Sequence, residues 1–158
     1  MDAYTVIPSP KGRIHLLVSP RGLKHCTLPG HPPEERGPCV APTDPHIKPY
    51  SDWIQAYFSG EYLPLPPLDP QGTPFQRAVW QQVTTIPPGH AKSYQAVAVA
   101  AGYPRASRAV GSAMARNPIP LFVPCHRVIR ADGDVGSFGG GRILKIWLLN
   151  HEKYYENR

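Results

Sequence analysis

The sequence predicts a mixed α/β fold of the α+β kind, divided into two small domains, and three observations lead to this prediction. Apolar residues alternate near the N-terminus and recur at helical spacing after residue 73. A proline-rich run over 63–72 separates these two patterns. We therefore expect a small antiparallel sheet with one helix over 1–69, resembling a ribonuclease-H-like fragment, and a mostly helical domain over 70–158. A hydrophobic fraction of 41% is enough for packed cores.

The first domain begins with the pattern of a β-hairpin over 3–28. Turn-forming residues at 9–12 and 20–22 flank a segment in which apolar residues alternate. The proline-rich stretch 29–45 predicts an irregular loop. Apolar residues at helical spacing over 46–58 then predict the one helix of this domain.

The second domain opens with the pattern of a capped helix. Thr73 precedes Pro74 and is followed three residues later by Gln76, which is the spacing of a capping box. The apolar face of this helix reaches Ile86, and the Pro-Pro-Gly sequence at 87–89 ends it.

Two further helices follow, joined by a short turn. Ser93 is placed to cap a helix over 94–101, Gly102 supplies a tight turn, and Pro104 is expected to open a helix over 104–116. Two helices joined in this way are typical of a helix-turn-helix.

The rest of the domain carries less regular signals. Residues 117–118 (Asn-Pro) break the preceding helix, 119–123 predict a short extended run, and the glycine-rich loop 132–141 fits no nucleotide-binding motif. A last helix is expected from Arg142 to about Glu152. Its expected buried residues are Leu144, Trp147 and Leu148.

Charge and cysteine content narrow the function classes. A net charge of +6 fits an anionic partner such as nucleic acid, although dispersed basic residues also fit a merely basic soluble protein. The three irregularly spaced cysteines predict neither a disulfide framework nor a zinc motif. Without a signal-peptide pattern or a long apolar run, we expect a cytoplasmic protein, nuclear in a eukaryote, with no membrane partner.

Cys125 and His126 are the candidate nucleophile and base. Only a thiolate is strongly nucleophilic, and an imidazole oriented by a carboxylate raises its fraction. Neighbouring side chains point in different directions, so a bridging water would complete the pair. The alternative interpretation is an inert buried cysteine.

The helix expected over 104–116 combines small residues with arginines. Small side chains suit close approach to a backbone or a narrow groove, whereas readers of the major groove need long polar side chains. Tight packing between helices explains the small residues equally well. The residues in question are Arg105, Ala106, Ser107, Arg108, Ala109, Gly111 and Ser112.

The stretches PFQRAVW, IPPGHAKSYQAVA, SRAVGSAMARNP, VPCHRVI and KIWLLNHE, in this order, resemble the O6-alkylguanine-DNA alkyltransferase family. The resemblance implies DNA repair by single-turnover transfer of an alkyl group from O6-alkylguanine, with O4-alkylthymine as a further candidate, after the base is flipped out. It implies no cofactor. The implied partner is double-stranded DNA, bound through the minor groove by a monomer with weak sequence preference.

The resemblance also assigns roles to individual residues. Cys125 is the implied alkyl acceptor, His126 its base through a water, and Glu152 orients His126. Asn117 braces the turn that carries the cysteine, and Tyr94 protonates N3 of guanine. The implied substrate pocket includes Val128, Met114, Phe138 and Gly139, and Arg108 of the helix is the residue that enters the base stack.

The chain departs from the family pattern at a few positions. Phe138 stands where tyrosine is usual, and Gly139 leaves only a backbone N–H to bind O6. Ser19 and Lys24 fall where zinc ligands are found in the human-type protein, so we expect no metal. Two other classes remain open: a binder of alkylated DNA, which would lack the acceptor cysteine, and a Cys-His hydrolase, which would need an oxyanion hole.

Overall fold

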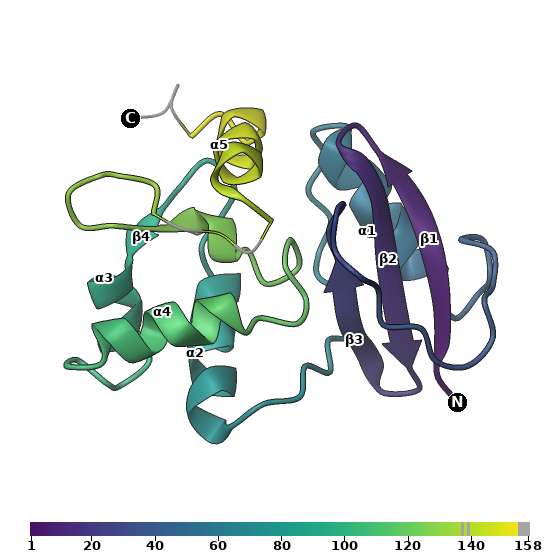
Figure 1. The fold of residues 1–158 in the computed structure, drawn as a ribbon, viewed down its shortest axis with the longest axis horizontal. Helices are drawn as coiled ribbons and strands as arrows, with labels where there is room; N and C mark the ends of the chain where they lie inside the picture. Colours follow the sequence, from purple (N-terminus) through teal and green to yellow (C-terminus); the bar gives the residue numbers. More distant parts are fainter. Residues whose placement is uncertain (137, 139, 155–158) are drawn as a thin grey trace. The chain divides into compact units, whose positions relative to one another are not determined.

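The computed structural model describes residues 1–136, 138 and 140–154, and it confirms a mixed α and β fold (Figure 1). The chain forms two compact units, Met1–Gln71 and Gly72–Arg158. Each unit is described by itself.

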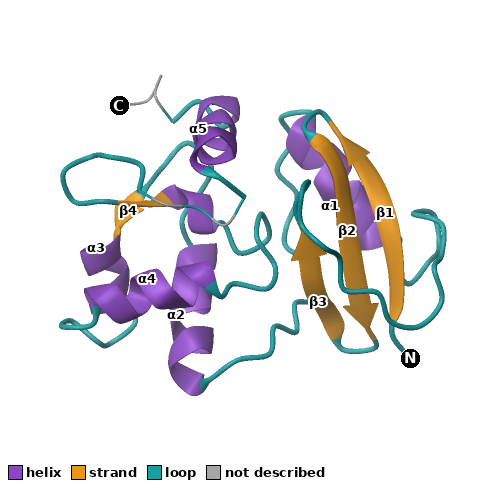
Figure 2. Cartoon of the chain, viewed as in Figure 1, coloured by secondary structure: helices purple, strands orange, loops and turns teal. Residues whose placement is uncertain are grey.

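The first unit is a three-stranded antiparallel sheet with one helix (Figure 2). Strands β1 (Ala3–Ser9), β2 (Gly12–Ser19) and β3 (Gly22–Thr27) follow in sequence order, and the two expected turns join them. Helix α1 (Lys48–Phe58) packs against β1. Alternate residues of the strands and the apolar face of α1 form the core, which includes Ile7, Leu16, Leu23, Ile54 and Tyr57.

The proline-rich run does not leave this unit as a free connector. The Leu23 N–H donates to the Pro67 carbonyl at 3.1 Å, and the Asp69 N–H donates to the Leu23 carbonyl at 2.8 Å. Strand β3 is an edge strand, so these two bonds satisfy backbone groups that β2 does not reach. Segment 29–45, expected to be an irregular loop, contains no helix and makes one bridge, from Cys39 to Tyr4.

The second unit starts with helix α2 (Pro74–Thr84), whose capping box is confirmed. The Gln76 N–H donates to the Thr73 hydroxyl at 3.1 Å, and the Thr73 N–H donates to the Gln76 side chain at 3.0 Å. Trp80 is the largest fully buried side chain, and its indole N–H donates to the Ala113 carbonyl at 2.9 Å. This bond joins α2 to helix α4 (Ser107–Ala115).

Helices α3 (Tyr94–Ala100) and α4 (Ser107–Ala115) follow, and Ser93 caps α3 as expected. The expectation that Pro104 opens the next helix is wrong. The Ala106 N–H donates to the Tyr103 carbonyl at 3.0 Å, which closes a turn, and α4 begins only at Ser107.

Two expectations for the remainder also fail. Residues 119–123 form a tight turn rather than an extended run, because the Val123 N–H donates to the Ile119 carbonyl. The buried side chains of this turn are Ile119, Leu121, Phe122 and Val123. After it come the 3-10 turn η1 (Cys125–Arg127) and strand β5 (Val128–Ile129), which pairs in parallel with β4 (Lys92–Ser93).

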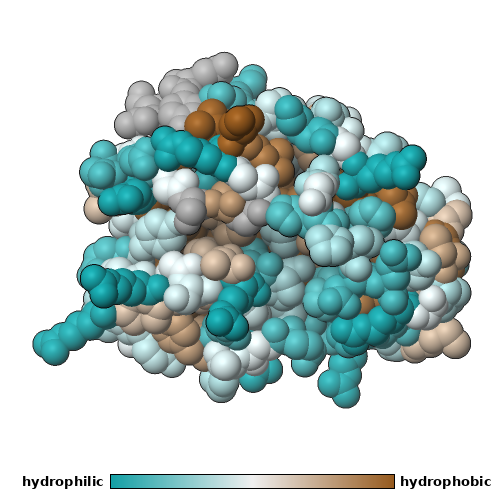
Figure 3. All heavy atoms as spheres, in the orientation of Figure 1, coloured by the Kyte–Doolittle hydropathy of each residue, from teal (hydrophilic) through white to brown (hydrophobic). Residues whose placement is uncertain are grey.

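Helix α5 (Arg142–His151) buries a different set from the one expected. Leu148 is buried, but Leu144 and Trp147 are only partly covered, and the other buried side chains are Lys145 and Leu149. Over the described residues, none of the helices has the length and apolar character needed to cross a membrane. Hydrophilic side chains predominate on the face drawn in Figure 3.

Candidate active site

A tightly braced turn presents Cys125. The Asn117 side chain bridges this turn, since its amide donates to the Val123 carbonyl at 2.9 Å and its oxygen accepts from the Ile119 N–H at 3.0 Å. Leu121 adopts a φ of 74°, which is rare for a residue with a side chain. The Cys125 N–H then donates to the Val123 carbonyl at 2.7 Å. The turn therefore fixes where the thiol points.

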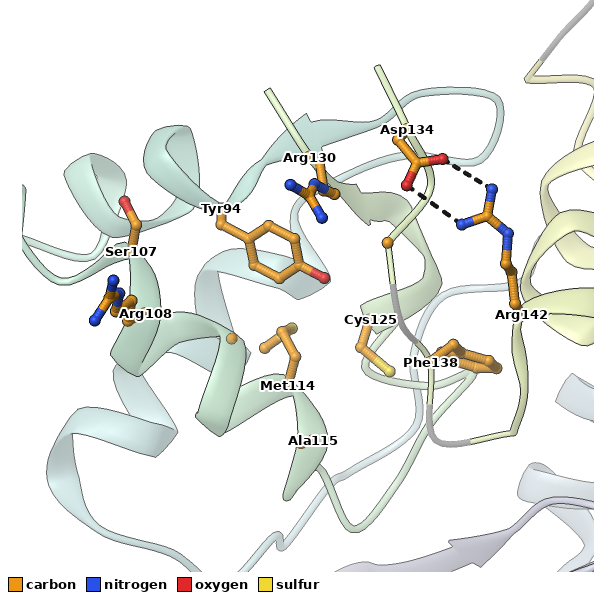
Figure 4. Close-up of a pocket in the computed structure, with 12 residues that line it drawn as sticks. Tyr94, Ser107, Arg108, Met114, Ala115, Cys125, Arg130, Asp134, Phe138 and Arg142 are labelled. Carbon is orange, nitrogen blue, oxygen red and sulfur yellow. Dashed lines mark hydrogen bonds and ion pairs between the residues drawn. The ribbon is translucent and has the colours of Figure 1, made fainter. Parts of the chain in front are cut away.

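Cys125 faces a pocket of about 930 Å³. The cysteine is only 7% exposed, so reagents reach it through this pocket. Figure 4 shows Tyr94, Met114 and Phe138 around the thiol, with the Tyr94 hydroxyl directed into the cavity. The lining residues are Tyr94, Ser107, Arg108, Gly111, Met114, Ala115, Cys125, Arg130, Asp134, Gly136, Phe138 and Arg142.

Behind the cysteine lies a buried network of three charged or ionisable side chains. His126 Nε2 lies 2.6 Å from a Glu152 carboxylate oxygen. Arg127 donates to both oxygens of the same carboxylate, at 2.7 and 3.0 Å, and to the Ile86 carbonyl at 2.7 Å. All three side chains are buried. A fork of guanidinium donors on one carboxylate fixes its orientation as well as its charge.

The charge state of this network leaves the His126 ring neutral. Burial opposes ionisation of Glu152, but His126 and Arg127 together hold the pKa of its carboxyl well below the usual range. Burial lowers the pKa of His126, and the nearby Glu152 only partly offsets it, so the ring is neutral near pH 7. An ionised carboxylate accepts hydrogen bonds only, so we assign the ring proton to Nε2.

The other nitrogen of the ring then carries the lone pair. His126 Nδ1 is buried and has no hydrogen-bond partner among the described residues. A buried polar atom without a partner is costly, and it points to a function at that atom.

Lys145 brings a positive charge to the same site. Its side chain is fully buried, and its ammonium donates to the Val128 carbonyl at 2.7 Å. Burial lowers the pKa of Lys145 to about 8, although the Cys125 thiolate and Asp134 favour the charged form. Burial likewise raises the pKa of Cys125, while the Asn117 amide and the Lys145 charge lower it in part. The resting thiol is therefore protonated, and ionisation depends on these neighbours.

Tyr94 is placed as a proton donor. Burial and the nearby Cys125 raise the pKa of its phenol, which Arg130 partly offsets, so the hydroxyl keeps its proton at neutral pH. Gly136 explains how close the hydroxyl comes to the loop: with φ of +76°, a Cβ there would lie 3.2 Å from the Tyr94 oxygen and 3.8 Å from Lys145 Nζ. Only a glycine leaves this corner of the pocket open.

Only some of the other residues expected in the substrate pocket line it. Met114 and Phe138 line it, and the Phe138 ring lies edge-on to His126 with centroids 6.3 Å apart. Val128 is fully buried and is not part of the pocket lining, and its carbonyl accepts from the Lys145 ammonium. Gly139 lies outside the described residues.

The residues expected to meet DNA lie on α4 and just before it. Ser107, Arg108 and Gly111 line the pocket, and a Cβ on Gly111 would meet nothing within 4 Å. The structure does not bring the others into the pocket: Arg105, Ala106, Ala109 and Ser112 lie outside its lining, and all but Ala106 are exposed.

Sequence reasoning missed several residues of the site. Arg127 and Lys145 are the buried charges, and Arg130, Asp134 and Arg142 stand at the pocket. A signal existed for Lys145, because it precedes Leu148 and Leu149 by three and four residues and so shares their helix face. Among the described residues, no group of three or more histidine, cysteine or acidic side chains could hold a metal ion.

Comparison with known proteins agrees with this arrangement. The family model for 6-O-methylguanine DNA methyltransferase, DNA binding domain, matches residues 74–154. A methylated-DNA–protein-cysteine methyltransferase from Rattus norvegicus is 38% identical over 169 residues, covering 94% of this chain and 81% of the relative. One from Methanosarcina barkeri is 39% identical, covering 95% and 96%.

A solved structure shares the fold along nearly the whole chain. The crystal structure of Mycobacterium tuberculosis OGT in complex with DNA superposes with a TM-score of 0.84 at 38% identity, covering 96% of this chain and 92% of that one. Fold and family model together define a DNA-binding protein whose pocket holds a buried cysteine. The chain belongs to the methylated-DNA–protein-cysteine methyltransferase family.

Proposed function

We propose that this protein repairs DNA by moving an alkyl group from O6 of guanine to Sγ of Cys125. The observation that carries the proposal is the cysteine itself, held at a pocket that a buried base adjoins. The family relatives are named for transfer to a protein cysteine. Cys125 is the one cysteine in this pocket, since Cys26 and Cys39 lie in the first unit.

The first step makes the thiolate. The lone pair on His126 Nδ1 takes the thiol proton, directly or through one water, and the Glu152 carboxylate stabilises the imidazolium that forms. The Lys145 ammonium and the Asn117 amide stabilise the thiolate. Burial works against this step, so each of these neighbours is needed.

The second step is an in-line displacement at the alkyl carbon. The bond from Sγ to carbon forms as the bond from carbon to O6 breaks, and the electron pair of that bond passes to guanine. Tyr94 gives its proton to N3, which makes neutral guanine the leaving group. Tyr94 regains a proton from water and His126 releases one. The thioether is not reversed, so each molecule acts once.

Helix α4 contacts the DNA. A base in a duplex cannot reach a 7% exposed cysteine, so the damaged nucleotide is flipped into the pocket, at a cost of roughly a few kcal/mol. The open surface at Gly111 and the exposed Ala109 suit a close approach in the minor groove, with Arg108 filling the gap in the stack. We propose a monomer with weak sequence preference, acting in the cytoplasm, or in the nucleus of a eukaryote.

Intact-protein mass after incubation with a duplex containing O6-methylguanine tests this function. We expect a lasting gain of one methyl group, absent in Cys125→Ser and retained in Cys39→Ser, a matched control because Cys39 is exposed in the first unit. Tight binding without a mass gain would favour a non-reacting binder. Turnover of an ester without a mass gain would favour a Cys-His hydrolase.

A further inference from the structure

Arg130 lines the pocket, but the proposed reaction assigns it no role. It follows β5 directly, and its side chain is 61% exposed at the edge of the pocket (Figure 4). Its backbone is held in a closed turn, because its N–H donates to the Asp134 carbonyl at 2.9 Å and its carbonyl accepts from the Gly133 N–H at 3.0 Å. The arginine therefore projects from a fixed point.

The stem of Arg130 passes close to Gly136. A Cβ built on Gly136 would lie 3.4 Å from Cγ of Arg130 and 3.2 Å from the Tyr94 hydroxyl, so the stem runs past both residues.

The local acids leave the positive charge of Arg130 largely uncompensated. Asp134 is engaged by Arg142, which donates to its two oxygens at 2.8 and 3.3 Å, and this pairing holds the pKa of Asp134 below its usual value. Asp132 lies 4.0 Å from Arg130, and both side chains are more than 60% exposed. A surface pair of this kind is screened by water and salt and is weak.

The pocket thus has arginines on three of its elements: Arg108 on α4, Arg130 after β5, and Arg142 on α5, whose guanidinium pairs with Asp134. A nucleotide that reaches Cys125 places its base inside while its phosphates stay at the mouth. We propose that Arg130 binds a backbone phosphate beside the flipped nucleotide, on the β5 side of the pocket. This inference rests on the proposed function, and it names a DNA contact outside α4.

Binding to duplexes tests the proposal, in a Cys125→Ser background that prevents transfer. Arg130→Gln should weaken binding to a duplex containing O6-methylguanine more than binding to the undamaged duplex, because only the damaged base is held in the pocket. For the damaged duplex, the slope of log affinity against log salt should fall by about 0.9, the value for one phosphate contact. The deficit should therefore shrink about 3.5-fold between 50 and 200 mM salt.

Two further variants sharpen the result. Arg130→Lys keeps the charge and should restore most of the salt slope. Arg13→Gln removes the same charge from an exposed position in the first unit, which contributes no residue to the pocket, and should leave the slope for damaged DNA unchanged.

An unchanged salt slope in Arg130→Gln overturns the proposal. So does an equal loss on damaged and undamaged duplexes, since that would mark a contact unrelated to flipping. With Cys125 intact, a slower transfer by Arg130→Gln at saturating DNA, together with an unchanged salt slope in the binding assay, would assign Arg130 a role in supporting Tyr94 and would also overturn the proposal. These outcomes are separate from failure of the proposed function, in which the protein with Cys125 intact gains no alkyl group.

Discussion

Removing the Arg127 guanidinium should destabilise the second unit strongly. Arg127→Met keeps most of the side-chain volume but deletes three buried hydrogen bonds, two to Glu152 and one to the Ile86 carbonyl. The carboxylate is left buried with His126 as its remaining partner in the network, and the carbonyl loses its donor. Breaking one side of a buried ion pair costs about 3 to 5 kcal/mol.

Calorimetry of the full chain measures the effect. At about 4 to 8 °C per kcal/mol for a unit of fewer than 100 residues, the melting temperature of the second unit should fall by roughly 12 to 40 °C. Arg127→Lys retains a charge without the fork and should lose about 1 to 3 kcal/mol. Arg77→Met, an exposed position on α2, serves as the matched control.

The dependence of folding stability on pH below 7, here called the acid limb, gives an independent readout. The pKa of Glu152 is depressed in the folded protein, so its stabilisation is present above the ordinary value of 4.5 and is lost as the pH falls below it. Without Arg127 the depression is smaller, and stability should fall less steeply on acidification. A loss below about 1 kcal/mol at pH 7 together with an unchanged acid limb would refute the view that Arg127 holds the carboxylate, because both follow from the same bonds.

Three other predictions concern the chemistry and its pH dependence. His126→Ala should slow alkyl transfer near neutral pH, with the deficit narrowing only well above pH 9, because burial raises the pKa of the unaided thiol; a deficit in single-turnover rate that stays constant up to the most alkaline pH at which the protein remains folded would argue against a base role. Lys145→Met should also slow transfer. It should further remove a rise in urea stability between pH 8 and 10.5, where the folded wild type has released the lysine proton and the unfolded chain still binds it; parallel stability profiles would contradict the lowered pKa. Arg108→Ala should reduce repair of duplex more than of single strands, since only a duplex has a gap to fill, and equal losses in the two assays would leave Arg108 as a simple phosphate contact.

Local sequence rules were sufficient where short-range bonds decide the structure. The capping box at Thr73, the Ser93 cap and the two strand-joining turns each depend on residues within a few positions of one another, and the structure contains all of them. The failed expectation at Pro104 has the opposite origin. A proline tolerates the first turn of a helix, but the Tyr103 carbonyl and the Gln95 side chain engage that segment instead.

Long-range features were out of reach for the same reason. That Lys145 would face Val128 and Cys125, or that Arg127 would reach Ile86, depends on how α5 and η1 pack, and no spacing within either segment encodes it. The short turn at Ile119 to Val123 shows the same limit, since burial of its apolar side chains and the Asn117 bridge override the extended form. The roles of the pocket residues remain predictions, although their placement is now visible.

The residue at position 136 limits how much space the pocket has beside Tyr94. Because this residue has no side chain, the loop backbone can lie close to both the phenol of Tyr94 and the ammonium of Lys145. A methyl group added there would crowd the Tyr94 hydroxyl, at 3.2 Å, and would make ordinary contact with Lys145 Nζ, at 3.8 Å, in a backbone conformation that already disfavours alanine. The same position therefore offers a protein engineer a graded way to tune which adducts the cavity admits, by way of its neighbours and without altering the cysteine.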